Sequence, residues 1–218
     1  PTAGKLVPRM RTTSMILYGI YTVMTLVLII LLIGGKMPVF DSFCIAFGTA
    51  GTGGFAVSSA GIAGYHSAYI EIVLGIFMLL FGVNFNVYHL LLLRKVKDVV
   101  KSEEVKVYFG IVLFATVAIT VNTFDRLTGI GTTIRNAFFQ VSSIMTTSGF
   151  ATVDFDAWPE FSKHTLVLLM IIGACAGSTG GGFKVSRVII LLKAFLAEIR
   201  HIITPKAVIT VRVDGKPV

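Results

Sequence analysis

Charged residues are scarce in this chain: only 14% of its 218 residues are Asp, Glu, Lys or Arg, whereas a typical soluble domain carries about 25%. This scarcity excludes an ordinary soluble domain, and the apolar content excludes a disordered tail. Cysteine is scarce as well, and Cys44 and Cys175 lie far apart without the spacing of a metal or redox motif. We interpret both as small buried residues. Because hydrophobic residues make up 55% of the chain, we expect an integral membrane protein.

Motifs of catalysis and nucleotide binding are also missing. Gly182 is followed by Phe183 before Lys184, so the Walker pattern is not met, and the glycines between residues 48 and 54 follow an expected helix rather than a strand. The histidines are scattered near the ends of apolar segments, without a Ser/His/Asp or metal-ligand arrangement. We therefore expect neither an enzyme nor a bound cofactor.

Four apolar segments are candidates for membrane-spanning helices. Residues 14–33 form an uncharged run of about 20 residues, the length that crosses about 30 Å of hydrocarbon. Residues 70–93 and 107–121 are expected to form a second and a third span. Residues 165–199 begin as a very apolar segment that is interrupted by the sequence GSTGGG. We interpret this last segment as one crossing that is broken in the middle.

The basic residues indicate how these spans are oriented. With four crossings, residues 1–13, 94–106 and 200–218 lie on one side of the membrane, and they hold most of the Lys and Arg. Cytoplasmic loops of membrane proteins collect these residues, so we expect both chain ends inside. Membrane topology then accounts for the net charge of +8, and we expect no nucleic-acid partner. No short charged leader precedes a cleavage site, so we also expect no signal peptide.

The chain resembles itself at an offset of 95 residues. This offset aligns residues 41–56, DSFCIAFGTAGTGGFA, with residues 136–151, NAFFQVSSIMTTSGFA, without a gap. The first and third spans align at the same offset, and so do the second and the fourth. The sequence therefore predicts two tandem units of span, short helix, Gly/Thr loop and span. Chance similarity between two membrane segments is the alternative explanation, because the identities are few.

Each aligned segment is too short to cross the membrane, so we expect a re-entrant hairpin. Asp41 and Asn136 are suitable N-caps for a helix of about ten residues, whose C-terminal end carries about half a negative charge. The loop that follows offers carbonyl and hydroxyl oxygens that can replace the water around a monovalent cation. Tight turns and close helix packing would explain the same residues, but two such loops in matching positions favour an ion path.

These motifs resemble the TrkH/TrkG/KtrB superfamily of potassium transporters, above all in GACAGSTGGGFKVSR, which begins at Gly173. The resemblance covers almost the whole chain and implies an all-α membrane protein with potassium as the transported substrate. It implies a selectivity filter in both Gly/Thr loops and a gate in the broken helix. The implied filter residues are Gly51, Thr52, Gly53, Gly54, Thr146, Thr147, Ser148 and Gly149, and the implied gate residues are Gly177, Ser178, Thr179, Gly180, Gly181 and Gly182.

The resemblance also implies a division of the chain into parts. Residues 1–98 would match the second of four family repeats, residues 99–203 the third, and residues 204–218 a cytoplasmic segment that leads into the fourth. The first and fourth repeats would then be missing from this sequence. The complete protein would take up potassium across the cytoplasmic membrane of a prokaryote. It would act as a homodimer in the lipid bilayer, regulated by a cytosolic nucleotide-binding subunit of the TrkA/KtrA type.

Two other functions stay open at this point. Broken helices near the membrane centre are also typical of ion-coupled secondary transporters, and a non-transporting membrane scaffold is a further alternative. Lys184 and Arg187, just after the gate segment, can repel cations, hold the loop or reach the cytoplasmic face. We expect Asn84, Asn86 and His89 to form interhelical hydrogen bonds rather than to contact an ion.

Overall fold

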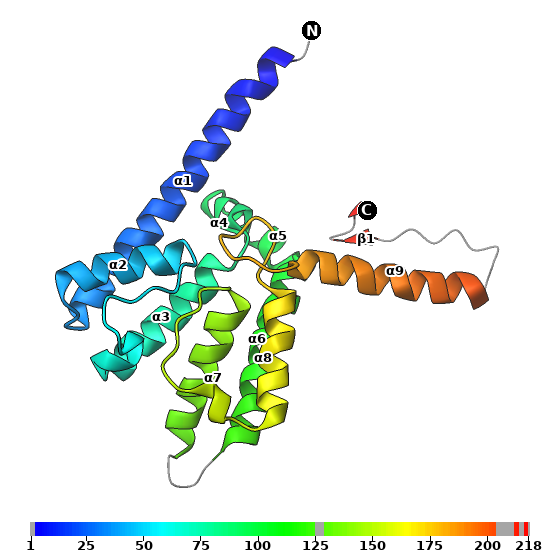
Figure 1. Cartoon of the computed structure of the whole chain (residues 1–218). Helices are drawn as coiled ribbons and strands as arrows, with labels where there is room; N and C mark the ends of the chain where they lie inside the picture. The colour runs from blue at the N-terminus through cyan, green and yellow to red at the C-terminus, as the bar shows by residue number, and fades with distance from the viewer. Residues whose placement is uncertain (1–2, 125–128, 204–211, 214–215, 218) are drawn as a thin grey trace.

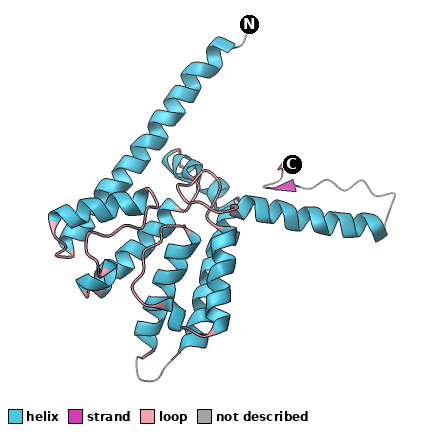
Figure 2. Cartoon of the chain, viewed as in Figure 1, coloured by secondary structure: helices cyan, strands magenta, loops and turns pink. Residues whose placement is uncertain are grey.

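The chain folds almost entirely into helices, as Figures 1 and 2 show. In this computed structural model, residues 3–124, 129–203, 212–213 and 216–217 are described. In chain order the elements are α1 (Ala3–Gly34), α2 (Val39–Ala50), the 3₁₀ helix η1 (Gly61–Tyr65), α3 (Ala68–Phe81), α4 (Phe85–Leu92), α5 (Val96–Lys101), α6 (Glu103–Thr123), α7 (Ile130–Met145), the 3₁₀ helix η2 (Phe155–Ala157), α8 (Glu160–Ile172), α9 (Val185–Ile203), β1 (Arg212–Val213) and β2 (Lys216–Pro217).

Within the described residues, the C-terminal segment contains two short strands. Strands β1 and β2 pair antiparallel, with Arg212 opposite Pro217 and Val213 opposite Lys216. An all-α expectation does not include this pair, which is too short to form a sheet of its own. The rest of the segment 204–218, which we expect to be cytoplasmic, lies outside the described residues.

Among the described residues, two helices are long and apolar enough to cross a membrane, namely residues Arg11–Gly34 of α1 and the whole of α6. They contain the expected spans 14–33 and 107–121. Their outward side chains are large and apolar, such as Ile30, which is 67% exposed, and Phe114, which is 74% exposed. Exposed apolar surface on this scale would be unfavourable in water, and it suits contact with lipid.

The second expected span, residues 70–93, is bent, and the sequence analysis did not predict this bend. α3 and α4 meet at an angle of 88°, and the break lies at Gly82, Val83 and Asn84. Asn84 begins α4 as its N-cap, because its side chain accepts a hydrogen bond from the backbone N of Asn86 at 3.0 Å. The asparagine therefore caps its own helix instead of forming the expected interhelical bond. Counted as one bent span, α3 and α4 bring the candidate crossings to three.

The fourth expected crossing is interrupted over a longer stretch than its glycine motif. α8 ends at Ile172 and α9 begins at Val185, and α9 leads away from the α6 and α8 pair in Figure 1. α8 has 13 residues, fewer than the roughly 20 that a span requires. α9 has 19 residues and carries four charged residues, Arg187, Lys193, Glu198 and Arg200. Neither helix passes as a span by itself, so the fourth crossing stays a prediction.

The short helices α2 and α7 begin earlier than the sequence predicted. Pro38 is the N-cap of α2, and Asp41 lies in its first turn rather than at the cap. α7 begins at Ile130, after Gly129, so Asn136 lies inside the helix. Both N-cap predictions were wrong, because a fixed proline φ and a glycine break begin these helices instead.

The two halves of the chain are interlocked rather than separate. α7 packs against α3, α6 and α8, whereas α2 packs against α1 and α3. One core cluster is built mostly from the first half, yet it includes Phe139 and Phe150 from the second. The other cluster is built mostly from the second half and includes Leu79 and Val83 from the first. The bent α3 is thus shared between both cores.

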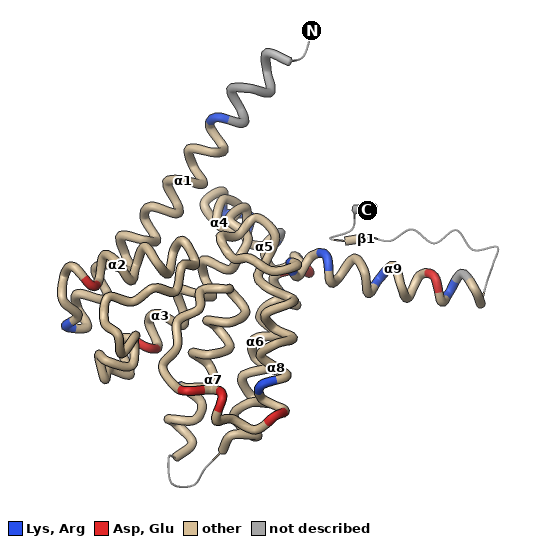
Figure 3. Tube along the Cα trace, viewed as in Figure 1, with Lys and Arg blue, Asp and Glu red and all other residues tan. Residues whose placement is uncertain are grey.

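Charge is distributed unevenly along the fold. Figure 3 shows acidic positions near the start of α8. Mostly basic positions lie along α9, which follows the opposite end of α8. Among the described residues, Asp154 and Asp156 lie in the turn before α8, where Asp154 accepts a hydrogen bond from the backbone N of Asp156. A local, exposed turn of this kind is the arrangement of a solvated loop.

Candidate pore site

Two Gly/Thr turns follow the C-terminal ends of α2 and α7 with the same backbone hydrogen bonds. In the first turn, residues 51–54, the backbone N of Gly53 donates to Gly48 O at 2.7 Å. In the second turn, residues 146–149, the backbone N of Ser148 donates to Ser143 O at 2.9 Å. Donors and acceptors in the two turns differ by 95 residues in both cases. The internal repeat is therefore present in the structure as well as in the sequence.

The backbone angles of the two turns match as well. Thr52 and Thr147 have φ values of 53° and 59°, and Gly54 and Gly149 have φ values of 69° and 84°. The left-handed region costs a residue with a side chain about 1–2 kcal/mol, so two threonines held there at equivalent positions require a reason. Strain of this kind persists where the surrounding structure imposes it, and it collects at functional sites.

The two turns lie against each other. A Cβ atom added to Gly54 would come within 2.2 Å of Ser148 O and within 3.0 Å of Gly149 C. Gly54 is therefore required both by its positive φ and by the neighbouring backbone. A Cβ on Gly149 would lie 3.9 Å from Gly54 Cα, an ordinary contact. The eight residues that we predicted as a filter are thus brought together as two adjacent backbone segments.

The glycine loop, residues 177–182, touches both turns through their threonines. The backbone N of Gly181 donates to Thr147 Oγ1 at 2.6 Å, and Thr52 Oγ1 donates to Thr179 O at 3.3 Å. The loop lies across the two turns, and the threonines in the left-handed conformation are the residues that bind it. The third predicted group of site residues therefore joins the first two.

The same loop is also bonded to the bend between α3 and α4. The backbone N of Phe85 donates to Gly177 O at 3.1 Å, and the backbone N of Cys175 donates to Gly82 O at 3.0 Å. Thr179 Oγ1 donates to Phe81 O at 3.2 Å. The interrupted ends of α3 and α4 thus pair with the interrupted end of α8, which satisfies backbone groups that a broken helix leaves without a partner. Sequence reasoning missed this bend, although Gly82 and Asn84 within an apolar run are the signal for it.

The loop folds back onto the end of α8. The backbone N of Lys184 donates to Ile172 O at 2.8 Å. A Cβ on Gly173 would lie 2.7 Å from Gly182 Cα, and a Cβ on Gly182 would lie 2.5 Å from Gly173 Cα. The two glycines therefore allow the backbone to pass over itself. Lys184 Nζ donates to Gly180 O, so of the three roles that we considered, the structure shows this lysine holding the loop.

Glu104 is the site residue that the sequence analysis did not identify. It lies in the first turn of α6 and is only 7% exposed. Its Oε1 accepts a hydrogen bond from the backbone N of Ala176 at 2.6 Å, immediately before the glycine loop. Nothing in the sequence distinguishes it from Glu103 beside it.

Polar contacts also fix the outer ends of the short helices. Tyr65 donates a hydrogen bond to Asp41 Oδ2 at 2.6 Å, which connects η1 to the first turn of α2. Partial burial and the carboxylate of Asp41 raise the pKa of Tyr65 to about 12. Arg135 on α7 pairs with Glu71 on α3 at 2.7 Å. These bonds hold α2 and α7 in place relative to α3.

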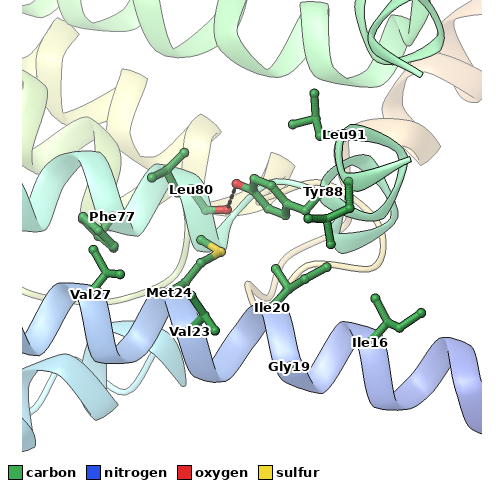
Figure 4. Close-up of a pocket in the computed structure, with 11 residues that line it drawn as sticks. Ile16, Gly19, Ile20, Val23, Met24, Val27, Phe77, Leu80, Tyr88 and Leu91 are labelled. Carbon is green, nitrogen blue, oxygen red and sulfur yellow. Dashed lines mark hydrogen bonds between the residues drawn. The ribbon is translucent and has the colours of Figure 1, made fainter. Parts of the chain in front are cut away.

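A large apolar groove lies on the other side of α3, between α1, α3 and α4. It measures about 680 Å³ and is lined almost wholly by aliphatic side chains, as Figure 4 shows. Its one hydroxyl group, on Tyr88, donates to Leu80 O at 2.6 Å. A groove without a free oxygen ligand cannot coordinate a cation. The oxygen-rich turns and the glycine loop are therefore the candidate ion site, and the groove is not.

A second, more polar hollow of about 500 Å³ lies next to the glycine loop. It is lined by α1 residues, among them Ser14, Tyr18 and Tyr21, and by Ser178 and Thr179 of the loop. It adjoins the loop at Ser178 and Thr179, whose hydroxyl groups donate to Cys175 O and Phe81 O. In the described part of the chain, no group of three or more His, Cys, Asp or Glu residues could hold a metal ion.

Apolar helices of membrane-spanning length place this chain among helical membrane proteins, and short helices that end in oxygen-rich turns are typical of those that move ions. The sequence comparisons give the family. Residues 2–127 and 112–218 match the family TrkH, described as "Cation transport protein". This chain belongs to the TrkH family.

Individual relatives agree with that assignment. The Trk system potassium uptake protein TrkH of Salmonella typhimurium is 34% identical over 98% of this chain and 45% of its own length. The Trk system potassium uptake protein TrkG of Escherichia coli is 32% identical over 97% of this chain and 44% of its own length. The crystal structure of the potassium transporter TrkH from Vibrio parahaemolyticus superimposes with a TM-score of 0.88 at 29% identity, covering 97% of this chain and 46% of that one. The chain thus spans about half the length of the relatives it matches.

Proposed function

We propose that this chain supplies two of the units that line a potassium-conducting pore in a transporter of the bacterial cytoplasmic membrane. The observation that carries the proposal is the pair of equivalent turns. Thr52 and Gly54 match Thr147 and Gly149 in φ angle, and Gly53 and Ser148 donate equivalent backbone hydrogen bonds. Two units with the same oxygen-rich turn, placed side by side, suit a ring of ligands around one ion path. The potassium uptake named for the relatives supports the choice of ion.

Residues 51–54 and 146–149 serve as the filter. The negative C-terminal ends of α2 and α7 lie directly before them, so a cation at the turns is stabilised by both helices. Backbone carbonyls and the threonine and serine hydroxyls replace the water that the ion sheds, and the ion then moves down its electrochemical gradient. This mechanism catalyses no reaction, in line with a family of cation transport proteins.

Residues 177–182 serve as the gate. Glycine carries no side chain, so this segment can change its backbone angles with a low barrier. Its bonds to Thr52 and Thr147 keep it directly next to the filter. Opening requires that these few bonds break while the bonds between the loop and the α3–α4 bend persist.

The larger organisation follows from the same proposal. Residues 1–98 and 99–203 form the two units, each with a re-entrant short helix, and α8 and α9 together make the broken outer helix of the second unit. Residues 204–218 continue toward a further unit. Both ends of the chain lie inside the cell. The complete transporter forms a homodimer and binds a cytosolic nucleotide-binding subunit of the TrkA/KtrA type through its basic inner segments.

Rubidium uptake tests this function in bacteria that lack their own potassium uptake systems and express the complete parent transporter. The unmodified protein should accumulate rubidium in preference to sodium. Gly54→Ser and Gly149→Ser, each in the complete transporter, should reduce this preference. Gly110→Ser on α6, where nothing lies within 4 Å of an added Cβ, is the matched control. Unchanged selectivity in both filter variants would contradict the assignment of the turns.

A further inference from the structure

Glu104 is a buried carboxylate that the proposed ion path does not use. It lies at the N-terminal end of α6, far from the filter turns along the chain, and only 7% of the residue is exposed. Its Oε1 accepts the backbone N–H of Ala176 at 2.6 Å. Because Ala176 directly precedes the glycine loop, this side chain connects α6 to the base of the proposed gate.

The burial of this carboxylate is compensated in a way that favours this contact. A buried charge is costly unless it is hydrogen-bonded or paired. The positive end of the α6 dipole supplies one compensation, and the N–H of Ala176 supplies a second. Lys184, on the other side of the loop, lies close enough to interact electrostatically with Glu104. A hydrogen bond to a charged group is shorter and stronger than a neutral one, so Ala176 is held more firmly than the glycines that follow it.

The other end of the loop is held by basic side chains, which are opposite in charge to Glu104. Lys184 Nζ donates to Gly180 O. Glu103, the neighbour of Glu104, pairs with Lys193 on α9. One turn of α6 is therefore attached to the chain before the loop, at Ala176, and to the helix after the loop, at Lys193. A movement of α9 relative to α6 would therefore be transmitted to Glu104, which holds Ala176.

We propose that Glu104 is a positioning residue that holds the glycine loop in place through its hydrogen bond to Ala176. Loss of this bond lets the loop move more often, which exposes it to the cytoplasmic side. This role rests on the proposed function of residues 177–182 as a gate. The role depends on the acceptor oxygen and on the length of the side chain that places it, and not on the charge alone.

Three substitutions separate reach from charge in the complete transporter. Glu104→Gln keeps an acceptor oxygen at the same distance but removes the charge. Glu104→Asp keeps the charge but withdraws the oxygens by one methylene. Glu104→Leu removes both. Glu160→Gln is the matched control for a lost carboxylate, because the Glu160 side chain is 75% exposed at the start of α8 and does not contact the loop.

The readout is the rate at which a charged methanethiosulfonate reagent, applied from the cytoplasmic side, modifies Ser178→Cys. Cys44 and Cys175 are replaced by alanine in every variant. Glu104→Asp and Glu104→Leu should raise this rate roughly tenfold, the factor expected for one lost hydrogen bond to a charged group. Glu104→Gln, which keeps a neutral acceptor at the same reach, should raise it by less than Glu104→Asp does, and Glu160→Gln should leave it unchanged.

Two outcomes would overturn the proposal. Equal modification rates in all variants would show that Glu104 does not hold the loop, and a raised rate in Glu104→Gln with a normal rate in Glu104→Asp would assign it a charge role instead. If Glu104→Leu does not fold, the comparison of Gln with Asp still decides. Rubidium selectivity, measured in parallel, should be the same in every variant. Loss of uptake in the unmodified parent would contradict the proposed function, whereas unchanged modification rates in a transporting parent would contradict this proposal alone.

Discussion

At the scale of single residues, the two candidate filter turns are alike in backbone but unequal in tolerance. Gly54 and Gly149 share a positive φ. Only Gly54, however, has the neighbouring backbone within 2.2 Å of the position that a Cβ would take. Sequence alignment treats these glycines as equivalent, because it cannot show which of them lies against the backbone of the neighbouring turn.

This inequality predicts different effects of alanine at the two positions. Gly54→Ala should reduce rubidium uptake by the complete transporter more than tenfold, because a left-handed alanine and a backbone collision occur together. Gly149→Ala should reduce it less, since its Cβ makes only an ordinary contact and the strain of about 1–2 kcal/mol remains. Initial uptake rates, normalised to the amount of protein in the membrane, measure both. Equal losses would contradict the contact between Gly54 and Ser148 O.

The Tyr65–Asp41 hydrogen bond gives a prediction for stability. Tyr65→Phe should lower the free energy of unfolding by about 1–2 kcal/mol, because it removes a bond to a charged acceptor that connects η1 with α2. The pKa of Tyr65 is raised to about 12 in the folded protein, so this contribution is complete below pH 10 and is lost as the pH rises toward 12. Melting temperatures of the purified transporter at neutral pH and at pH 11 measure the difference. The gap between wild type and variant should be smaller at pH 11.

At the scale of elements, apolar length predicted the straight helices well, and backbone breaks were predicted poorly. Residues 14–33 and 107–121 lie inside α1 and α6, because about 20 apolar residues in succession have few alternatives to a spanning helix. The bend at Gly82 was missed because its partners lie in the glycine loop, nearly a hundred residues later. The N-caps were misplaced for a related reason. Asp41 bonds to Tyr65 instead, and a local pattern does not show such a distant partner.

The bend between α3 and α4 predicts that Gly82 cannot be replaced. A Cβ there would lie 2.4 Å from the Tyr108 hydroxyl and 2.8 Å from Thr146 Cγ2. Gly82→Ala should therefore destabilise the protein by about 1–3 kcal/mol through overpacking. Gly110→Ala, in the middle of α6 with open space around it, should be stabilising by up to about 1 kcal/mol. Thermal unfolding in detergent compares the two variants. A lower melting temperature for Gly110→Ala than for Gly82→Ala would contradict the packing at the bend.

At the scale of the whole molecule, the halves are held together by side chains that cross from one repeat to the other. Phe150 is 3% exposed and packs in the core of the first half, where its ring lies 3.3 Å from the position of a Cβ on Gly48. Its counterpart in the first repeat, Phe55, is 83% exposed. The sequence predicted that the turns at residues 51–54 and 146–149 are equivalent, because turn patterns are local, and their role in binding an ion stays a prediction. The sequence did not predict Glu104 or the interlocked cores, which depend on contacts between distant segments.

The interlocking predicts a large cost for the loss of Phe150. Phe150→Ala should lower the free energy of unfolding by about 3–5 kcal/mol, as for other buried phenylalanines. Phe114→Ala, on the exposed face of α6, is the control and should change it by less than about 1 kcal/mol. Melting temperatures of the complete transporter measure both variants. Similar temperatures would indicate that the two halves do not share a core.

The location of the bound ion tests the central claim most directly. A structure of the complete transporter in thallium, with the anomalous signal recorded, shows where a potassium-like cation binds. The account predicts a peak surrounded by oxygens of residues 51–54 and 146–149, just above residues 177–182. A peak elsewhere, with these two turns packed against protein and free of any cation, would contradict it.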